Sequence, residues 1–137
     1  MRILGLDVGD KRIGVALSDP MGILASTLTV IERKAGNSEF EAILALVREH
    51  AVGRIVVGFP RSMDGSIGKQ AQKTNAFAEA LSKLTDVPIE LSDERLSTWE
   101  ANKLLRESGK NRQQIKARRD KAAAALILQW YLDEHRG

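Results

Sequence analysis

Two apolar stretches, Ile3–Val8 and Ile13–Leu17, flank the polar residues Gly9–Arg12, and this pattern predicts two antiparallel strands joined by the tight turn Gly9–Lys11. In the first strand, one face holds Leu4, Leu6 and Val8, and the other holds Ile3, Gly5 and Asp7. Asp7 therefore takes a position where alternation would place another core side chain. It either accepts hydrogen bonds from backbone N–H groups of the turn or binds a metal ion at the end of a central strand. Gly9 favours the metal site, because a residue without a side chain lets a phosphate approach the backbone.

The pattern continues as a third strand, followed by helices and strands in alternation. The predicted elements are strands over Ile23–Ile31, Gly53–Pro60 and Val87–Ser92, helices over Glu39–His50, Lys69–Leu84 and Ile115–Glu134, and a helix capped by Ser97 or Thr98 that ends near Ser108. In the second of these helices, the residues predicted to face inward are Ala71, Ala76, Phe77, Ala80, Leu81 and Leu84. The third strand completes an antiparallel meander, whereas the continuous apolar run Gly53–Pro60 is typical of a parallel strand buried on both faces. This order predicts the α/β class and the five-stranded mixed sheet of the ribonuclease H-like fold, flanked by helices.

Bulk properties narrow the class of protein. The length of 137 residues predicts one domain, residues 1–137, with one core. No apolar run approaches the roughly 20 residues that span a bilayer, and Met1-Arg2 leads directly into the first strand rather than into a signal peptide. We therefore expect a cytoplasmic protein. The sequence has no cysteine, which excludes disulfides, thiolate metal sites and a cysteine nucleophile.

The charge is unevenly distributed along the chain. The formal net charge is +3, yet the segment from Lys103 to Lys121 holds eight basic and two acidic residues. A basic segment on an otherwise slightly acidic body favours a polyanionic partner such as nucleic acid. The alternative is a solvated charged linker.

A glycine-bearing polar loop, Arg61–Gly68, joins the predicted parallel strand to the helix that follows it. Loops at this place in α/β sheets bind ligands, and their free N–H groups can hold phosphate. The pattern G-x-x-x-x-G-K-[ST] is absent, so this loop is not a P-loop. A generic surface loop would have the same composition.

Carboxylates also stand at the end of the fifth strand and near the start of the last helix. Asp93 and Glu94 follow the strand, and Asp120 begins the helix stripe that should be buried. The alternative for Asp120 is an ion pair with Arg118 or Lys121. If the first and fifth strands point the same way, the acids meet at one end of the sheet, where like charges repel unless cations hold them. Carboxylate oxygens suit Mg²⁺ or Mn²⁺, and two such ions about 4 Å apart can activate water and stabilise the leaving oxygen of a phosphodiester.

Four motifs in order span nearly the whole chain and together are specific for one family. They are Leu6-Asp7-Val8-Gly9 with Lys11-Arg12-Ile13-Gly14-Val15-Ala16 and Ser18-Asp19, then Gly58-Phe59-Pro60 with Met63-Asp64-Gly65, then Asp93-Glu94-Arg95-Leu96-Ser97-Thr98, and last Asp120 leading an alanine-rich helix with Ile127-Leu128 and Tyr131-Leu132. In these motifs the chain resembles the YqgF family, also called RuvX.

The resemblance implies a ribonuclease H-like nuclease, a divalent-metal-dependent hydrolase that processes the 5′ end of pre-16S ribosomal RNA in ribosome biogenesis. The family is also described as a Holliday junction resolvase, which would act on branched DNA. Carried over by position, the catalytic metal site would be Asp7, Glu94 and Asp120 with Mg²⁺ or Mn²⁺, and the cleaved strand would keep a 5′-phosphate. The candidates for contacts to the nucleic-acid backbone are Lys11, Arg12, Arg95, Arg118 and Arg119.

The chain departs from the family pattern in two places. Asp10 stands where relatives commonly have a small hydroxyl residue, which adds a negative charge beside the expected site. Phe59 and Arg61-Ser62 replace the more usual leucines and asparagine of the glycine loop. In addition, Asp93 competes with Glu94 as the metal ligand, because simple alternation places Asp93 on the same face as Ile89 and Leu91.

Other classes share parts of the pattern. Sugar kinases and actin-like ATPases begin with a similar Asp-x-Gly hairpin, but they need two such domains around a nucleotide, and this chain has room for one. A non-catalytic nucleic-acid-binding domain or ribosome assembly factor would bind RNA without cleaving it in Mg²⁺ or Mn²⁺. The choice between pre-rRNA and branched DNA stays open, since both present phosphodiesters to the same chemistry. We expect a monomer or a homodimer, because symmetric cleavage of a junction would require a two-fold dimer.

Overall fold

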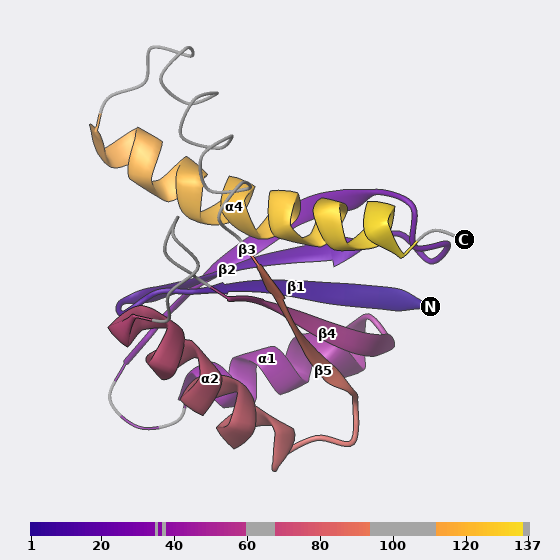
Figure 1. Ribbon diagram of the computed structural model, residues 1–137, viewed down its shortest axis with the longest axis horizontal. Coiled ribbons are helices and arrows are strands. Elements are labelled where there is room, and N and C mark those ends of the chain that lie inside the picture. Colours follow the sequence, from indigo (N-terminus) through magenta and orange to yellow (C-terminus); the bar gives the residue numbers. More distant parts are fainter. Residues whose placement is uncertain (35, 37, 60–67, 94–111, 136–137) are drawn as a thin grey trace.

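A five-stranded mixed sheet forms the centre of the molecule, with the strand order β3-β2-β1-β4-β5 (Figure 1). The structure is a computed structural model. It describes residues 1–34, 36, 38–59, 68–93 and 112–135, with the backbone alone at 93 and 112–122. The strands are β1 (Arg2–Val8), β2 (Arg12–Ser18), β3 (Ala25–Glu32), β4 (Val52–Phe59) and β5 (Ile89–Asp93), and the helices are α1 (Ser38–Glu49), α2 (Lys69–Ser82) and α4 (Arg112–Glu134).

The pairing of the strands confirms the predicted α/β fold. β1 pairs antiparallel with β2, and β2 pairs antiparallel with β3, which is the expected meander. β4 lies between β1 and β5 and is parallel to both. β5 is an edge strand, and Pro88 directly precedes it, where a missing backbone N–H costs no ladder bond.

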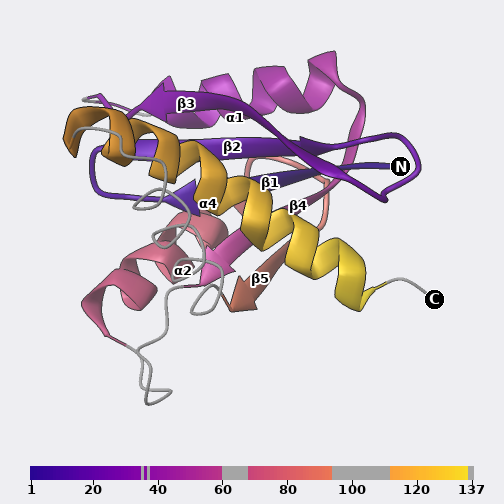
Figure 2. The same cartoon turned by 90° about the horizontal axis from the view of Figure 1, so that it is seen from above.

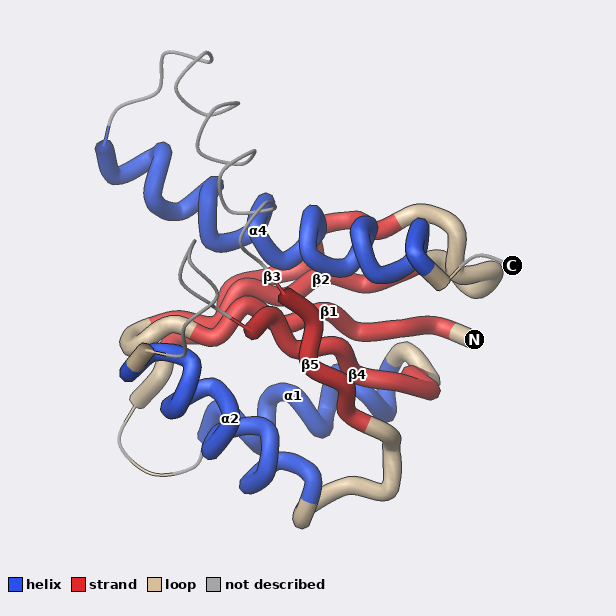
Figure 3. The backbone as a smooth tube through the Cα atoms, in the orientation of Figure 1, coloured by secondary structure: helices blue, strands red, loops and turns tan. Residues whose placement is uncertain are grey.

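The helices form two layers on opposite faces of the sheet (Figures 1 and 3). α1 and α2 cover one face, and α4 crosses the other face obliquely, as the view from above shows (Figure 2). On the α1 and α2 side, the buried core contains Leu4, Leu6, Val8, Ile13, Val15, Ile43, Val47, Val52, Ile55, Val57, Phe77 and Leu81. On the α4 side, it contains Ile3, Ala16, Val56, Ala124, Ile127, Leu128, Tyr131 and Leu132. The predicted division of β1 into two faces is therefore confirmed.

The third strand begins two residues later than its hydrophobic pattern predicted, at Ala25 instead of Ile23. The Asp19 carboxylate accepts hydrogen bonds from the N–H groups of Ile23 and Leu24, at 2.7 and 3.0 Å. A side chain that binds these two donors takes them out of the sheet ladder, so the turn extends at the expense of the strand.

The buried face of α2 also differs from the predicted one. Its buried residues are Ala71, Thr74, Phe77, Ala78 and Leu81, whereas Ala76 and Ala80 are exposed and Leu84 lies beyond the helix and is 53% exposed. Thr74 is tolerated in the core because its hydroxyl donates to the carbonyl oxygen of Gln70 at 2.9 Å.

The helix predicted to end near Ser108 lies outside the described residues. Within the described part of the chain, no helix is both long and apolar enough to cross a membrane.

Candidate active site at the end of the first strand

Three parallel strands end at the same edge of the sheet. β1 and β4 pair in the register that sets Leu6 beside Val57, and β4 and β5 pair in the register that sets Phe59 beside Asp93. The carboxyl ends of parallel strands are where open α/β sheets bind ligands. The expectation that the first and fifth strands point the same way is confirmed, so the ends that carry Asp7 and Asp93 share this edge.

Asp7 is half-buried on the α4 face of the sheet, the face of Ile3 and Gly5. Its register partner on β2 is Gly14. On β4 the residue at the same level is Gly58, since Val57 pairs with Leu6. Neither neighbouring strand therefore places a side chain beside the carboxylate at this level. Glycine within a strand often marks a place where a ligand or another part of the backbone approaches closely.

α4 packs closely on β1 at Gly5. A Cβ atom added at Gly5 would lie 2.9 Å from the Cβ atom of Leu128 and 3.3 Å from the carbonyl oxygen of Ala124. Ile3, two residues earlier in β1, belongs to the same cluster as Leu132, four residues later in α4. The helix therefore runs back along β1 in the opposite direction, with its C-terminal end near the start of the strand.

The same packing determines where the earlier part of α4 lies. One turn before Ala124 is position 120, about 6 Å further along the helix axis. Asp7 lies two residues beyond Gly5, about 6.6 Å further along the strand. Because helix and strand run in opposite directions from a shared contact, the backbone of α4 at position 120 extends toward the end of β1 that carries Asp7.

The expected acidic residues are only partly covered by the structure. The backbone of Asp93 and Asp120 is described without their side chains, and Glu94 lies outside the described residues. Asp93 is the register partner of Phe59, so it holds the pleat position opposite to that of Ser92. Among the side chains that the structure describes, no three carboxylate or imidazole groups gather to hold a metal ion.

The structure describes the side chains of only some of the basic residues expected to contact nucleic acid. Lys11 is exposed in the β1–β2 turn. Arg12 is half-buried, and its Nε lies 3.8 Å from a carboxylate oxygen of Glu32 on the neighbouring strand. Arg95 lies outside the described residues, and α4 carries Arg118 and Arg119 at positions where the backbone alone is described.

The turn that follows Asp7 is fixed by backbone hydrogen bonds. The Gly9 N–H donates to the carbonyl oxygen of Arg12 at 2.8 Å, and a Cβ atom at Gly9 would lie 2.9 Å from that same oxygen. Gln70 of α2 donates its side-chain amide to the Val8 carbonyl at 3.1 Å. The turn thus requires glycine at this position and is tied to the adjacent helix.

Arg33, directly after β3, holds the other side of this turn. Its Nη1 donates to the Gly9 carbonyl oxygen at 2.8 Å, and its backbone N–H donates to the Lys11 carbonyl oxygen at 2.8 Å. Its Nη2 lies 3.8 Å from Oε1 of Glu39, a carboxylate only 5% exposed. The guanidinium carbon lies 5.5 Å from the centre of the Phe77 ring, within the range of a cation–π contact. One side chain therefore joins the turn to both α1 and α2.

The family model described as "RuvX: Holliday junction resolvase" matches residues 1–134 of the chain. The chain belongs to the RuvX family. A relative from Pelotomaculum thermopropionicum, named "Putative pre-16S rRNA nuclease", is 52% identical over 97% of this chain and 87% of its own length. Relatives of the same name from Halothermothrix orenii and Thermoanaerobacter pseudethanolicus are 47% and 48% identical, over 97% and 99% of this chain and 95% and 99% of their own lengths.

Two solved structures share the fold of this RuvX chain. RuvC of T. thermophilus, in complex with a Holliday junction substrate, superposes with a TM-score of 0.57 at 13% identity and covers 98% of this chain and 97% of its own. The Fowlpox virus resolvase, in complex with Holliday junction DNA, superposes with a TM-score of 0.57 at 10% identity, over 98% of both chains. The predicted ribonuclease H-like fold is thereby confirmed in its RuvC-like form.

In this RuvX chain, Asp10 forms an ion pair that sequence reasoning did not predict. Its Oδ1 lies 3.2 Å from Nζ of Lys73 on α2, and both side chains are more than half exposed. Sequence reasoning also missed Arg33 and Glu39. The signal for Glu39 would have been its position just before the apolar stripe of α1, but a glutamate in a first helical turn is usually a surface charge that complements the helix dipole.

Proposed function

We propose that this RuvX chain is a metal-dependent endonuclease that hydrolyses a phosphodiester bond of precursor 16S rRNA. Family membership and the names of relatives near 50% identity support the reaction and the substrate. The observation that carries the proposal is Asp7, a half-buried carboxylate at the end of the central parallel strand, with glycines at its level on both neighbouring strands.

Asp7, Glu94 and Asp120 would hold Mg²⁺ or Mn²⁺. The donor set is made of oxygen atoms alone, and the chain has no cysteine, which suits hard divalent cations. The course of α4 supports Asp120 as a partner of Asp7, since the helix backbone at position 120 extends toward the end of β1. The pleat of β5 supports Glu94 over Asp93. Ser92 is level with Asp7 in the sheet and shares its face, so Asp93 belongs to the opposite face and continued alternation would return Glu94 to the face of Asp7.

When bound, the metal ion would activate a water molecule and neutralise charge on the leaving oxygen. The chain itself contributes orientation. Asp7 sits on a strand paired on both sides, and the turn after it is fixed by the contacts of Gly9 and Arg33. Rigid elements hold the side chains of a site within the small positional error that such chemistry tolerates.

The basic residues would bind the phosphates on either side of the cleaved bond. Lys11 is exposed in the turn directly after the Asp7 strand, and Arg12 follows it. Arg95, Arg118 and Arg119 would extend the same contact surface. Binding should fall steeply with salt, because each phosphate contact releases counterions. The cleaved strand would keep a 5′-phosphate.

A second candidate, a resolvase of branched DNA, is favoured by the description of the matching family model. The catalytic carboxylates would be the same, and the difference would lie in the geometry of the substrate. Symmetric cleavage of a junction would also require a two-fold dimer.

One cleavage assay tests both candidates. A pre-16S rRNA fragment that contains the 5′ processing region and a four-way DNA junction are incubated in parallel with Mg²⁺ or Mn²⁺. The proteins compared are the wild type, Asp7→Ala and Asp86→Asn, a control that removes a carboxylate exposed beyond α2. We expect the wild type and the control to cleave the RNA and Asp7→Ala to be inactive while folded. RNA binding without cleavage in either metal would reject the nuclease and favour an assembly factor, and preferred cleavage of the junction would favour the resolvase.

A further inference from the structure

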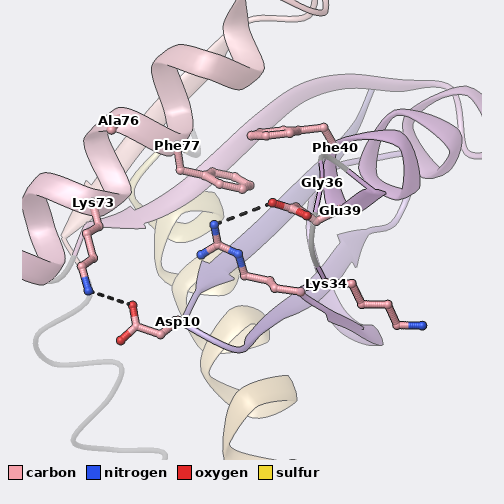
Figure 4. Close-up of a pocket in the computed structure, with 9 residues that line it drawn as sticks. Asp10, Lys34, Gly36, Glu39, Phe40, Lys73, Ala76 and Phe77 are labelled. Atoms are coloured by element: carbon pink, nitrogen blue, oxygen red, sulfur yellow. Dashed lines mark hydrogen bonds and ion pairs between the residues drawn. The ribbon is translucent and has the colours of Figure 1, made fainter.

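An open cavity of about 630 Å³ lies beside the turn that follows the Asp7 strand (Figure 4). Its walls come from three parts of the chain: the β1–β2 turn, the segment that leads from β3 into α1, and one face of α2. Its lining residues are Asp10, Arg33, Lys34, Gly36, Glu39, Phe40, Lys73, Ala76 and Phe77. A cavity of this size is within the range of sites for small organic groups.

The charged groups of the cavity are arranged in two levels. On the floor, Arg33 is committed to the Gly9 carbonyl and to the buried Glu39 carboxylate, so these two charges compensate each other. At the rim, Lys34 and Lys73 are exposed cations. Lys73 forms an exposed ion pair with Asp10 at 3.2 Å. Among the residues that the structure describes, Lys34 forms no ion pair. An exposed pair of this kind is worth little and exchanges readily with a competing anion.

The remaining wall of the cavity is apolar. The rings of Phe40 and Phe77 are stacked with their centres 5.0 Å apart, and Phe40 remains half-buried rather than buried. Ala76 is exposed on the neighbouring turn of α2. Cations at the rim and an aromatic wall behind them are the two elements with which proteins bind a nucleotide of a single strand, the phosphate outside and the base inside.

We propose that this cavity binds a nucleotide in a single-stranded segment of the substrate, close to the cleaved bond. Lys34 and Lys73 contact its phosphates, and the base packs against the wall that contains Phe40 and Ala76. The inference rests on the proposed function, since it takes the ligand to be part of the strand that is cut. It narrows the substrate to one with unpaired nucleotides beside the cleavage site.

The cavity lies close enough to Asp7 for one strand to reach both. Asp10 at its rim is three residues from Asp7, which limits the separation of their Cα atoms to about 11 Å. Phosphates are spaced about 3.4 Å per nucleotide along the axis of a stacked strand, so the interval corresponds to at most about three nucleotides. A base reaches the aromatic wall only if it leaves a duplex, because in a duplex the bases are paired inside and the phosphates face outward.

Asp10 acts as a competitor in this arrangement. Its carboxylate occupies the partner position on Lys73 that a phosphate would take, and it adds a negative charge at the rim. Removing the Asp10 charge and removing the Lys73 charge should therefore change binding in opposite directions. A helix surface charge without a role in binding would not show this pattern.

The test measures binding in the absence of cleavage. Fluorescence anisotropy follows a labelled single-stranded RNA oligonucleotide of mixed sequence, and the same RNA annealed to its complement, with Asp7→Asn protein in EDTA at several salt concentrations. In this background the variants are Lys34→Ala, Lys73→Ala, Asp10→Asn and, as a matched control, Lys83→Ala. Lys83 is exposed just after α2, about 15 Å along the helix axis from Lys73.

We expect Lys34→Ala and Lys73→Ala each to weaken binding of the single strand about three- to fivefold and to reduce the slope of log K against log salt by about 0.7. Asp10→Asn should tighten binding about twofold, and Lys83→Ala should leave it unchanged. The Lys73→Ala effect should be larger in the Asp10→Asn background than alone, because Asp10 no longer competes with the phosphate for Lys73. Phe40→Leu, which keeps an apolar side chain, should weaken binding of the single strand and leave that of the duplex unchanged.

Two outcomes would overturn the inference. One is that Lys34→Ala and Lys73→Ala bind like Lys83→Ala, and the other is that every variant affects the duplex as strongly as the single strand. Cleavage by the wild type is assayed separately. If the wild type cleaves pre-16S rRNA and the cavity variants bind normally, the cavity proposal alone fails. If the cavity variants lose binding and the wild type cleaves nothing, the proposed nuclease function fails and the cavity remains a strand-binding site.

Discussion

Gly5→Ala tests the contact that positions α4 against β1. The added Cβ atom would lie 2.9 Å from Leu128 Cβ and 3.3 Å from the Ala124 carbonyl oxygen. Neither atom is the end of a flexible side chain, so the helix must move by several tenths of an ångström. Overpacking of this kind costs about 1–3 kcal/mol. For a chain of this length, a loss of about 2 kcal/mol should lower Tm by roughly 8 °C.

The same displacement should affect catalysis if Asp7 on β1 and Asp120 on α4 share a metal ion. A site of this type tolerates about 0.5 Å of misplacement. We therefore expect Gly5→Ala to reduce kcat for RNA cleavage about tenfold at a temperature where the variant is fully folded. Calorimetry measures Tm, and single-turnover cleavage with Mg²⁺ measures the rate.

Gly68→Ala is the matched control, because a Cβ atom at Gly68 meets nothing within 4 Å and its φ of −91° suits alanine. Leu128→Gly supplies a second test: combined with Gly5→Ala, it should cost less stability than the sum of the two single changes, because glycine removes the Cβ atom that the added methyl group meets. A Gly5→Ala protein with the Tm and activity of the wild type would refute the close packing of α4 on β1.

Three further changes probe other contacts. Arg33→Ala should lower the free energy of unfolding in urea by about 2–4 kcal/mol, because it leaves the buried Glu39 carboxylate without its cation, and wild-type stability would contradict this. Ser18→Ala should cost about 1–3 kcal/mol in the same assay, since the buried Ser18 hydroxyl accepts the Ile3 N–H at 2.8 Å, and a neutral effect would show that another group accepts that donor. Burial raises the pKa of Tyr131, the single tyrosine of the chain, so absorbance at 295 nm should give a midpoint above that of free tyrosine. The stability gained from the neutral phenol is then complete below the unfolded-state pKa and is lost as pH rises through the folded-state pKa, and a midpoint at or below the free value would contradict the burial.

Much of the fold follows from local alternation of residue types. The two faces of β1, the continuous apolar run of β4 and the order of elements are all properties of short stretches, and each was predicted. The start of β3 was not, because the Asp19 carboxylate takes two backbone donors that the hydrophobic pattern assigns to the strand. Thr74 was missed for a similar reason: its hydroxyl bonds within its own helix, which lets a polar residue occupy a core position.

The candidate site likewise contains residues that the local pattern reveals and contacts that it does not. Asp7 was predicted because a carboxylate interrupts an apolar alternation, which a single sequence reveals. Arg33 donates to the carbonyl of Gly9, 24 residues earlier in the chain, and its guanidinium lies over the ring of Phe77 in α2. Contacts between residues so far apart in the sequence leave no periodic pattern that would predict them. The pair of Asp10 and Lys73 is separated by 63 residues and depends on the packing of α2 against the turn.

We propose that Asp7, Glu94 and Asp120 hold a divalent cation together. Isothermal titration of Mn²⁺ into the wild type and into Asp7→Asn, Glu94→Gln, Asp120→Asn and Asp10→Asn tests it without any substrate. We expect saturable binding by the wild type and by Asp10→Asn, and at least tenfold weaker binding by each of the other three. Equal Mn²⁺ affinity in the wild type and in Asp7→Asn would show that Asp7 does not bind the cation.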